Sequence, residues 1–237
     1  MIRVIRVPGN LRLTLRRLLA IHSLARQSWR PTAASRAAAM VVVVAAGCGV
    51  LVGGTARLMD VFGPTGIARV GAGVAAWITL AFWTARRSER SLIAVVAAAA
   101  FLLVWLSAYF TTDAIQQGVP VTTMWSLARV WVVLLGPASI FIGVAAWRSR
   151  RGGLAGDAAL ALPFSWSLVE AGRGAQIATS IGAWLLESSL LFGIAAAVVV
   201  DGWRQRRVNA RAFVLGVLIG AVGFSFAAVA WFLLRRP

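Results

Sequence analysis

Seven long apolar segments, separated by short polar stretches, make up most of the chain after residue 36. They cover about 37–56, 67–85, 91–110, 123–147, 157–171, 176–200 and 211–234. An α-helix needs roughly 20 residues, at about 1.5 Å each, to cross a hydrocarbon core of about 30 Å. Six of the segments meet this length. The pattern therefore predicts an all-α fold, a polytopic transmembrane helix bundle of about seven spans.

The fifth segment, 157–171, has only 15 residues and contains Pro163, so its length alone indicates a re-entrant or buried segment. The arginines of the loops favour a full crossing. With a cytoplasmic N-terminus and seven crossings, 18 of the 24 arginines lie on the cytoplasmic side and five outside. Without the fifth crossing, the four-arginine loop 204–211 would lie outside and the C-terminal pair would move inside. Because Lys and Arg are enriched in cytoplasmic loops, we expect seven crossings and an external C-terminus.

Residues 1–36 differ from the apolar part, since they contain eight arginines and no acidic residue. Within them, 10–26 place several leucines on one side of a helix, which predicts an amphipathic helix on the cytoplasmic leaflet. Two alternatives remain open: a disordered basic tail, and translation that begins at Met40. We accordingly divide the chain into a basic segment, 1–36, and a membrane bundle, 37–234.

The composition supports the membrane class, because 60% of the residues are hydrophobic and 13% are charged. Soluble domains have about 45–50% apolar and about 25% charged residues. All 24 basic residues are arginines, and the net charge is +17. Because they cluster between apolar segments, anionic lipid head groups at the cytoplasmic face are the expected partner, and nucleic acid is not. The only cysteine, Cys48, lies in an apolar segment and is expected to be a small buried side chain.

Common catalytic and metal-binding motifs are missing. The only histidine, His22, precedes the apolar segments, and the chain has no lysine. A zinc site of the histidine type, a Ser–His protease, a Schiff base and a Walker A loop are therefore excluded within the bundle. We expect no catalytic, cofactor-binding or metal-binding residue, no cofactor and no enzymatic activity.

Three ionisable residues within the apolar segments are the candidate functional residues: Glu187, Arg129 and Glu170. Such residues are costly in hydrocarbon and normally face protein or water. Glu187 lies eleven residues into the segment 176–200, close to the expected midplane. Arg129 and Glu170 are both expected in the outer leaflet, where a bidentate pair would reduce the cost of both charges. Two interpretations remain open, namely charges that only hold helices together, and a proton- or substrate-handling role for Glu187.

Small residues and prolines add two weaker signals. Gly49 and Gly53, like Gly216 and Gly220, have the GxxxG spacing that lets helices approach closely; we expect packing within one bundle rather than a dimer interface. Pro137 and Pro163 free backbone carbonyls inside predicted spans, as at transporter sites. However, the chain has no visible pair of inverted halves.

The run from Leu135-Gly136-Pro137 to Ile142-Gly143 is followed by an arginine loop and then by a short segment that ends at Glu170. In these features the sequence resembles an uncharacterised family of small multi-pass membrane proteins from actinobacteria. The stretch 77–82 and the pair Tyr109-Phe110 fit loosely. The resemblance covers about residues 40–200 and rests on non-specific motifs. It implies a membrane location and several helices, but no activity.

These observations predict a non-enzymatic multi-pass protein of the bacterial plasma (inner) membrane, with its N-terminus in the cytoplasm. One alternative is a small transporter or permease component with Glu187 as a protonatable site. Another is a membrane-anchored interaction module that acts through its basic N-terminal helix. A transporter predicts a polar cavity at Glu187, whereas a structural role predicts that Glu187 is paired and sealed.

Overall fold

The computed structural model describes residues 33–177, 180–205 and 208–234. The chain divides into two units, Met1–Ala39 and Met40–Pro237, and the packing described below is that of the second unit. The segment 10–26, expected to be an amphipathic helix, lies outside the described residues.

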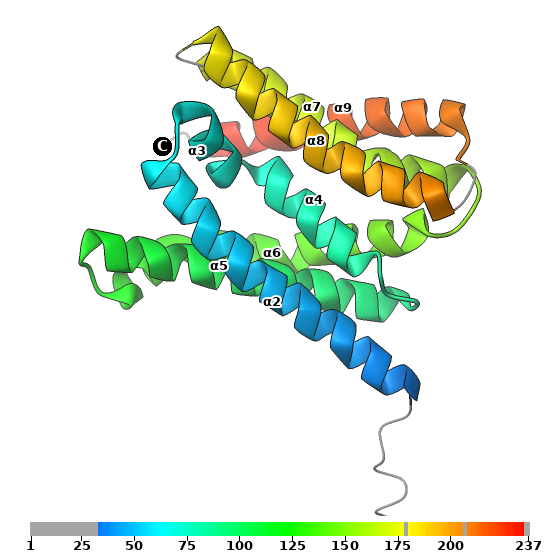
Figure 1. Ribbon diagram of the computed structural model, residues 1–237, viewed down its shortest axis with the longest axis horizontal. Helices are drawn as coiled ribbons and strands as arrows, with labels where there is room; N and C mark the ends of the chain where they lie inside the picture. Colours follow the sequence, from blue (N-terminus) through cyan, green and yellow to red (C-terminus); the bar gives the residue numbers. More distant parts are fainter. Residues whose placement is uncertain (1–32, 178–179, 206–207, 235–237) are drawn as a thin grey trace, which may run out of the picture. The chain divides into compact units, whose positions relative to one another are not determined.

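The described residues form helices and no strand, which confirms the all-α prediction. The helices are α2 (Ala33–Phe62), α3 (Thr65–Ala72), α4 (Val74–Ala85), α5 (Ser91–Gln117), α6 (Val121–Ser149), α7 (Leu154–Ile177), α8 (Ile181–Gln205) and α9 (Ala210–Leu234) (Figure 1). Leu, Ala and Met favour helices in general. In lipid, an apolar run of this length can form all its backbone hydrogen bonds within itself only as a helix.

Four described helical segments are long and apolar enough to cross a membrane: Ala33–Phe62, Ser91–Gln117, Ala128–Ser149 and Ile181–Gln205. Val74–Ala85 and Ala210–Val222 are shorter apolar helices. The membrane class is therefore supported, while the expected number of about seven spans is not confirmed. Many large apolar side chains face outwards, among them Val133, Phe141 and Ile219. Exposed apolar surface of this extent is typical of lipid-facing helices.

Three of the differences between the predicted segments and the observed helices change the surroundings of Glu170 and Glu187. The segment 67–85 is not one helix, because it is interrupted at Gly73 between α3 and α4. The fifth segment is longer than expected: α7 has 24 residues, about 36 Å, and continues through Pro163. The sixth starts later, so that Glu187 lies about 9 Å from the first residue of α8 rather than near the middle of a span.

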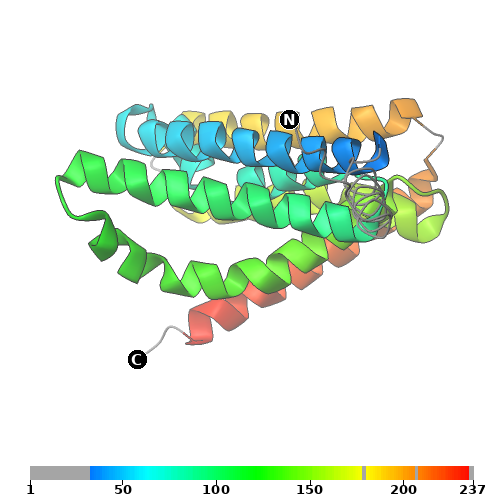
Figure 2. The same ribbon diagram turned by 90° about the horizontal axis from the view of Figure 1, so that it is seen from below.

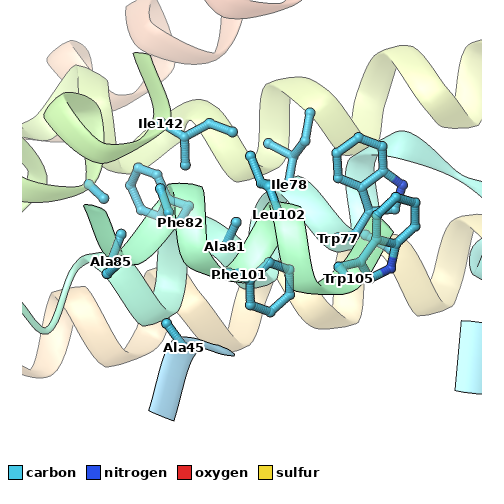
Figure 3. Packing of buried hydrophobic residues seen from close by; sticks show 14 of the residues in the cluster. Ala45, Trp77, Ile78, Ala81, Phe82, Ala85, Phe101, Leu102, Trp105 and Ile142 are labelled. Carbon is cyan, nitrogen blue, oxygen red and sulfur yellow. The ribbon is translucent and has the colours of Figure 1, made fainter. Parts of the chain in front are cut away.

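The short helix α4 is the most enclosed part of the second unit. It packs against α5, α6, α7 and α8, while α3 packs against α8. Its side chains Trp77, Ile78 and Phe82 are buried and meet Phe101 and Trp105 of α5 (Figure 3). The indole rings of Trp77 and Trp105 stack with their centroids 4.4 Å apart. The core of the bundle is therefore built around the second half of an interrupted helix.

Small residues bring the outer helices close to their neighbours. A Cβ atom at Gly49 or Gly53 would collide with the backbone of α5 at Phe101 and Trp105. In the same way, Gly216 of α9 lies against α7 at Ala158. Both predicted GxxxG pairs thus pack helices within one bundle, as expected. Figure 2 shows the α5–α6 hairpin, which turns at Gly118, a residue with φ of 65°.

Candidate functional site

The interruption between α3 and α4 depends on Gly73. This residue is buried and extended, with φ of −71° and ψ of 132°. A Cβ atom here would stand 2.9 Å from the carbonyl oxygen of Arg69, so only glycine fits without a shift. The N-cap residue of α4, Gly73, has no side chain that could cap the first turn, and a helix start leaves backbone N–H groups without intrahelical partners. At membrane depth, such backbone is tolerated only where protein or a water-filled cavity surrounds it.

Glu170 of α7 lies beside this interruption. Its side chain is 5% exposed, and its Cγ would be 3.8 Å from a Cβ atom placed on Gly73. Its Oε1 is 3.5 Å from Nη2 of Arg173, whose side chain is 60% exposed. The carboxylate is therefore buried near the N-terminus of α4, where a negative charge is electrostatically favoured.

Glu187 of α8 is the most enclosed carboxylate of this region, with a side chain that is 3% exposed. The Oε2 atom of Glu187 is 3.7 Å from Nη1 of Arg69 on α3. This oxygen accepts no hydrogen bond from the described residues. The carboxylate lies directly against Gly174 of α7, where an added Cβ atom would be 2.9 Å from Oε2.

These four residues form one group, which we call the Glu187 cluster: Arg69, Glu170, Arg173 and Glu187. The two carboxylates are close enough for their charges to act on each other, and Arg173 acts on both. Arg69 reaches Glu187 from α3, on the other side of the interruption from α4. One long ion pair of the cluster therefore connects α3 to α8, and the other lies within α7. A proton or a small cation is the species that two such carboxylates could exchange.

The expected pair of Arg129 and Glu170 is not formed. Glu170 faces Gly73 and pairs with Arg173, whereas Arg129 is exposed on α6. The sequence predicted a similar membrane depth for Arg129 and Glu170. Depth alone, however, does not determine the direction in which a side chain points from its helix.

A second charged group, which the sequence did not predict, joins α2 to α5. We call Arg57, Asp60, Tyr109 and Asp113 the Arg57 network. Arg57 contacts Asp60 at 2.6 Å and Asp113 at 2.5 Å, and the hydroxyl of Tyr109 donates to Asp60 at 2.9 Å. Asp60 and Asp113 lie beyond the predicted segments 37–56 and 91–110, but α2 and α5 continue to Phe62 and Gln117. The i, i+3 spacing of Arg57 and Asp60 is the one sequence signal that pointed to this network.

A third group lies at the other end of α4. Arg86, expected in a loop, is 3% exposed. Its Nε donates to Ser149 Oγ at 3.1 Å, its Nη1 to Asp201 Oδ2 at 3.0 Å and its Nη2 to Gln205 Oε1 at 3.4 Å. This single guanidinium thus fixes the ends of α4, α6 and α8 relative to one another.

Comparisons with family models, curated proteins and solved structures give no match for this chain. The resemblance to an actinobacterial membrane family therefore stays a prediction. Within the described ranges, no group of three or more His, Cys, Asp or Glu side chains could hold a metal ion.

Proposed function

We propose that this chain is a small multi-pass transporter of the bacterial plasma membrane, in which Glu187, with Glu170 beside it, exchanges protons at the interruption between α3 and α4. The observation that carries this proposal is the state of Glu187. Its carboxylate is buried among helices, yet its Oε2 accepts no hydrogen bond and meets Arg69 only at 3.7 Å.

The contrast with the Arg57 network supports a functional role for this carboxylate. A buried charge that only holds helices together is stable when close ion pairs and hydrogen bonds offset its desolvation. The Arg57 network meets this condition, with contacts of 2.5–2.9 Å. The ion pairs of the Glu187 cluster are 3.5 Å and 3.7 Å long, so its carboxylates are compensated less. Intramembrane carboxylates of this kind are common in proton relays.

The interrupted helix supports the same proposal. Discontinuous helices form the substrate and ion sites of many secondary transporters, because their ends present unpaired backbone groups inside the protein. Here the interruption lies at the start of α4, the most enclosed helix, and Glu170 lies beside the interruption. Gly73 separates α3 from α4, and we propose that α3 moves relative to α4 there and carries Arg69 with it. Proton exchange at Glu187 would then follow the separation of Arg69 from its carboxylate.

A purely structural role is the second candidate, and one observation favours it. Glu187 is paired with Arg69 and sealed from solvent, as expected for a charge that holds helices together. Transport therefore requires an opening between α7 and α8 near Gly174. The two roles differ in what Glu187→Gln does, because only a transporter loses proton movement without a matching loss of stability.

Reconstituted vesicles that enclose a pH-sensitive dye test the proposal. With a membrane potential that is negative inside, we expect the wild-type protein to admit protons faster than empty vesicles do. Glu187→Gln should abolish the difference, and Asp113→Asn, a matched carboxylate-to-amide change in the Arg57 network, should retain it per folded molecule. Equal rates for wild-type and empty vesicles, with a large fall in melting temperature for Glu187→Gln, would favour the structural role.

We also propose seven crossings with a cytoplasmic N-terminus. Arg86, Ser149 and Asp201 meet at one end of the bundle, while Arg57 and Asp113 meet near the other ends of their helices. This arrangement supports alternating directions for successive spans, if α3 and α4 cross as one. With 24 residues, α7 is long enough to cross. An alkaline phosphatase fusion after Pro237 should be active, since the enzyme matures only outside the cytoplasm. An inactive fusion would show that the C-terminus is cytoplasmic and that the chain has one crossing fewer.

A further inference from the structure

A cavity of about 170 Å³ lies at the end of the bundle opposite the Glu187 cluster. Its lining residues come from α4, α8 and the segments that follow α4 and α6: Trp83, Arg86, Arg87, Arg150, Asp201 and Gln205. The volume is sufficient for several water molecules, and thus for a phosphate group. Because it is separated from Gly73 by the length of α4, its role does not depend on proton exchange at Glu187.

The buried side of the cavity is fixed. Arg86 is held by Ser149, Asp201 and Gln205, and Gln205 Nε2 also donates to Asp201 Oδ1 at 3.3 Å. Gly202 permits this arrangement, because a Cβ atom there would stand 3.0 Å from Nη2 of Arg86. Among the described residues that line the cavity, Asp201 carries the only carboxylate, and Arg86 and Gln205 already engage it.

The rim of the cavity consists of two exposed guanidinium groups, those of Arg87 and Arg150. The Arg87 guanidinium lies over the ring of Trp83, 4.7 Å from its centroid. Nη1 of Arg150 donates to the carbonyl oxygen of Arg87 at 3.2 Å, which keeps the two arginines adjacent. Neither side chain forms a salt bridge with an acidic residue in the part of the chain that the structure describes. The rim thus carries two positive charges that no described carboxylate compensates.

We propose that this cavity binds a phosphate group, held between the guanidinium groups of Arg87 and Arg150, above the ion pair of Arg86 and Asp201. Guanidinium groups recognise phosphate through parallel, charge-assisted hydrogen bonds, and the cation–π contact with Trp83 pre-orients one of them. The Oδ atoms of Asp201 face Arg86 and Gln205, so they do not take the place of the anion.

The position of the cavity indicates an anionic phospholipid as the source of the phosphate. It lies where α4 and α8 end and where α5 begins, and tryptophans such as Trp83 and Trp147 favour the interface between lipid and water. Basic pockets between membrane helices at this level bind phospholipid head groups. Free phosphate or a soluble phosphate ester offers the same chemistry without the acyl chains.

Thermal unfolding of the full-length protein in a neutral detergent tests the site. Phosphatidylglycerol should raise the melting temperature in a saturable manner, and phosphatidylcholine, which has no net charge, should have a much smaller effect. In Arg87→Ala/Arg150→Ala, the apparent Kd for phosphatidylglycerol should increase at least about tenfold, because two charge-assisted contacts are lost. Arg90→Ala/Arg151→Ala removes two charges at the same end outside the lining residues and should retain the wild-type Kd.

Inorganic phosphate and glycerol 3-phosphate, added in parallel, distinguish the two sources. A response to phosphatidylglycerol alone assigns the site to a lipid, and a response to the soluble phosphates as well assigns it to the phosphate group itself. If the double variant does not fold, Arg87→Ala and Arg150→Ala alone should each weaken binding several-fold. Equal weakening in Arg90→Ala/Arg151→Ala, equal stabilisation by phosphatidylcholine, or unchanged binding in the rim variants would overturn the proposal.

Discussion

Gly174 of α7 lies directly against the carboxylate of Glu187 on α8, so that a Cβ atom added to Gly174 would stand 2.9 Å from Oε2 and 3.1 Å from Oε1. The absence of a side chain at position 174 thus provides the space in which the buried carboxylate lies.

We expect Gly174→Ala to destabilise the protein by about 1–3 kcal/mol, because the methyl group must displace the carboxylate or separate α7 from α8. Gly172→Ala is the matched control, since nothing lies within 4 Å of a Cβ atom at that position. Removing a glycine from a helix there should stabilise the protein by about 0.5–1 kcal/mol. Thermal unfolding in detergent measures both changes, and equal effects of the two variants would show that Glu187 does not occupy the space beside Gly174.

The Arg57 network should behave as an interaction that holds α2 against α5. Arg57→Met and Asp113→Asn each remove one ion-pair partner from a largely buried charge, although Asp60 still contacts Arg57 and Gln117 still donates to Asp113. We expect each change to lower the free energy of unfolding by about 2–4 kcal/mol. The double variant should lose less than the sum, with an interaction energy of about 1–3 kcal/mol. Losses that simply add would contradict the close contact between the two residues.

Gly53 should tolerate no larger side chain, because α2 touches the backbone of α5 at Trp105. Gly53→Leu is expected to cost about 1–3 kcal/mol, as overpacking generally does. Gly47 lies six residues earlier, on an exposed side of α2, where no described atom lies within 4 Å of an added Cβ atom. Gly47→Leu should therefore leave the melting temperature nearly unchanged, and a comparable loss in both variants would contradict the contact between α2 and α5.

The basic segment 10–26 remains a prediction of the sequence. A peptide of these residues should gain helical circular dichroism on addition of anionic vesicles, because its arginines are attracted to the head groups and its leucines enter the interface. The signal should decrease as the salt concentration rises. Unchanged spectra with vesicles would contradict the prediction. If the chain is an interaction module that acts through this segment, deleting 1–35 should abolish its function and leave its insertion into the membrane intact.

The apolar pattern was sufficient to predict the helices but not their interruption. Residues 67–85 have the composition of a continuous span, and Gly71 and Gly73 are equally consistent with close packing. The interruption at Gly73 lies beside Glu170 of α7, and a tertiary neighbour of this kind leaves no periodic signal in the sequence.

The charged residues were predicted unevenly, for a related reason. Glu170 and Glu187 are acidic residues within apolar runs, so their burial was predictable. Arg57, Asp113 and Arg86 lie near segment ends, where arginine and aspartate are normally solvated, and their burial depends on which helix ends meet. The partner of Arg129 was predicted wrongly, because the sequence gives the depth of a residue but not the direction of its side chain in the assembled bundle.

Proton exchange at Glu187 is the central claim, and infrared difference spectroscopy tests it most directly. Spectra of the reconstituted wild-type protein at acidic and alkaline pH should differ by the carbonyl stretching band of a buried protonated carboxylic acid. This band should be lost or strongly reduced in Glu187→Gln and retained in Asp113→Asn. A band of equal intensity in wild-type and Glu187→Gln, or no such band in the wild-type protein, would contradict the assignment of Glu187 as the proton-exchanging group.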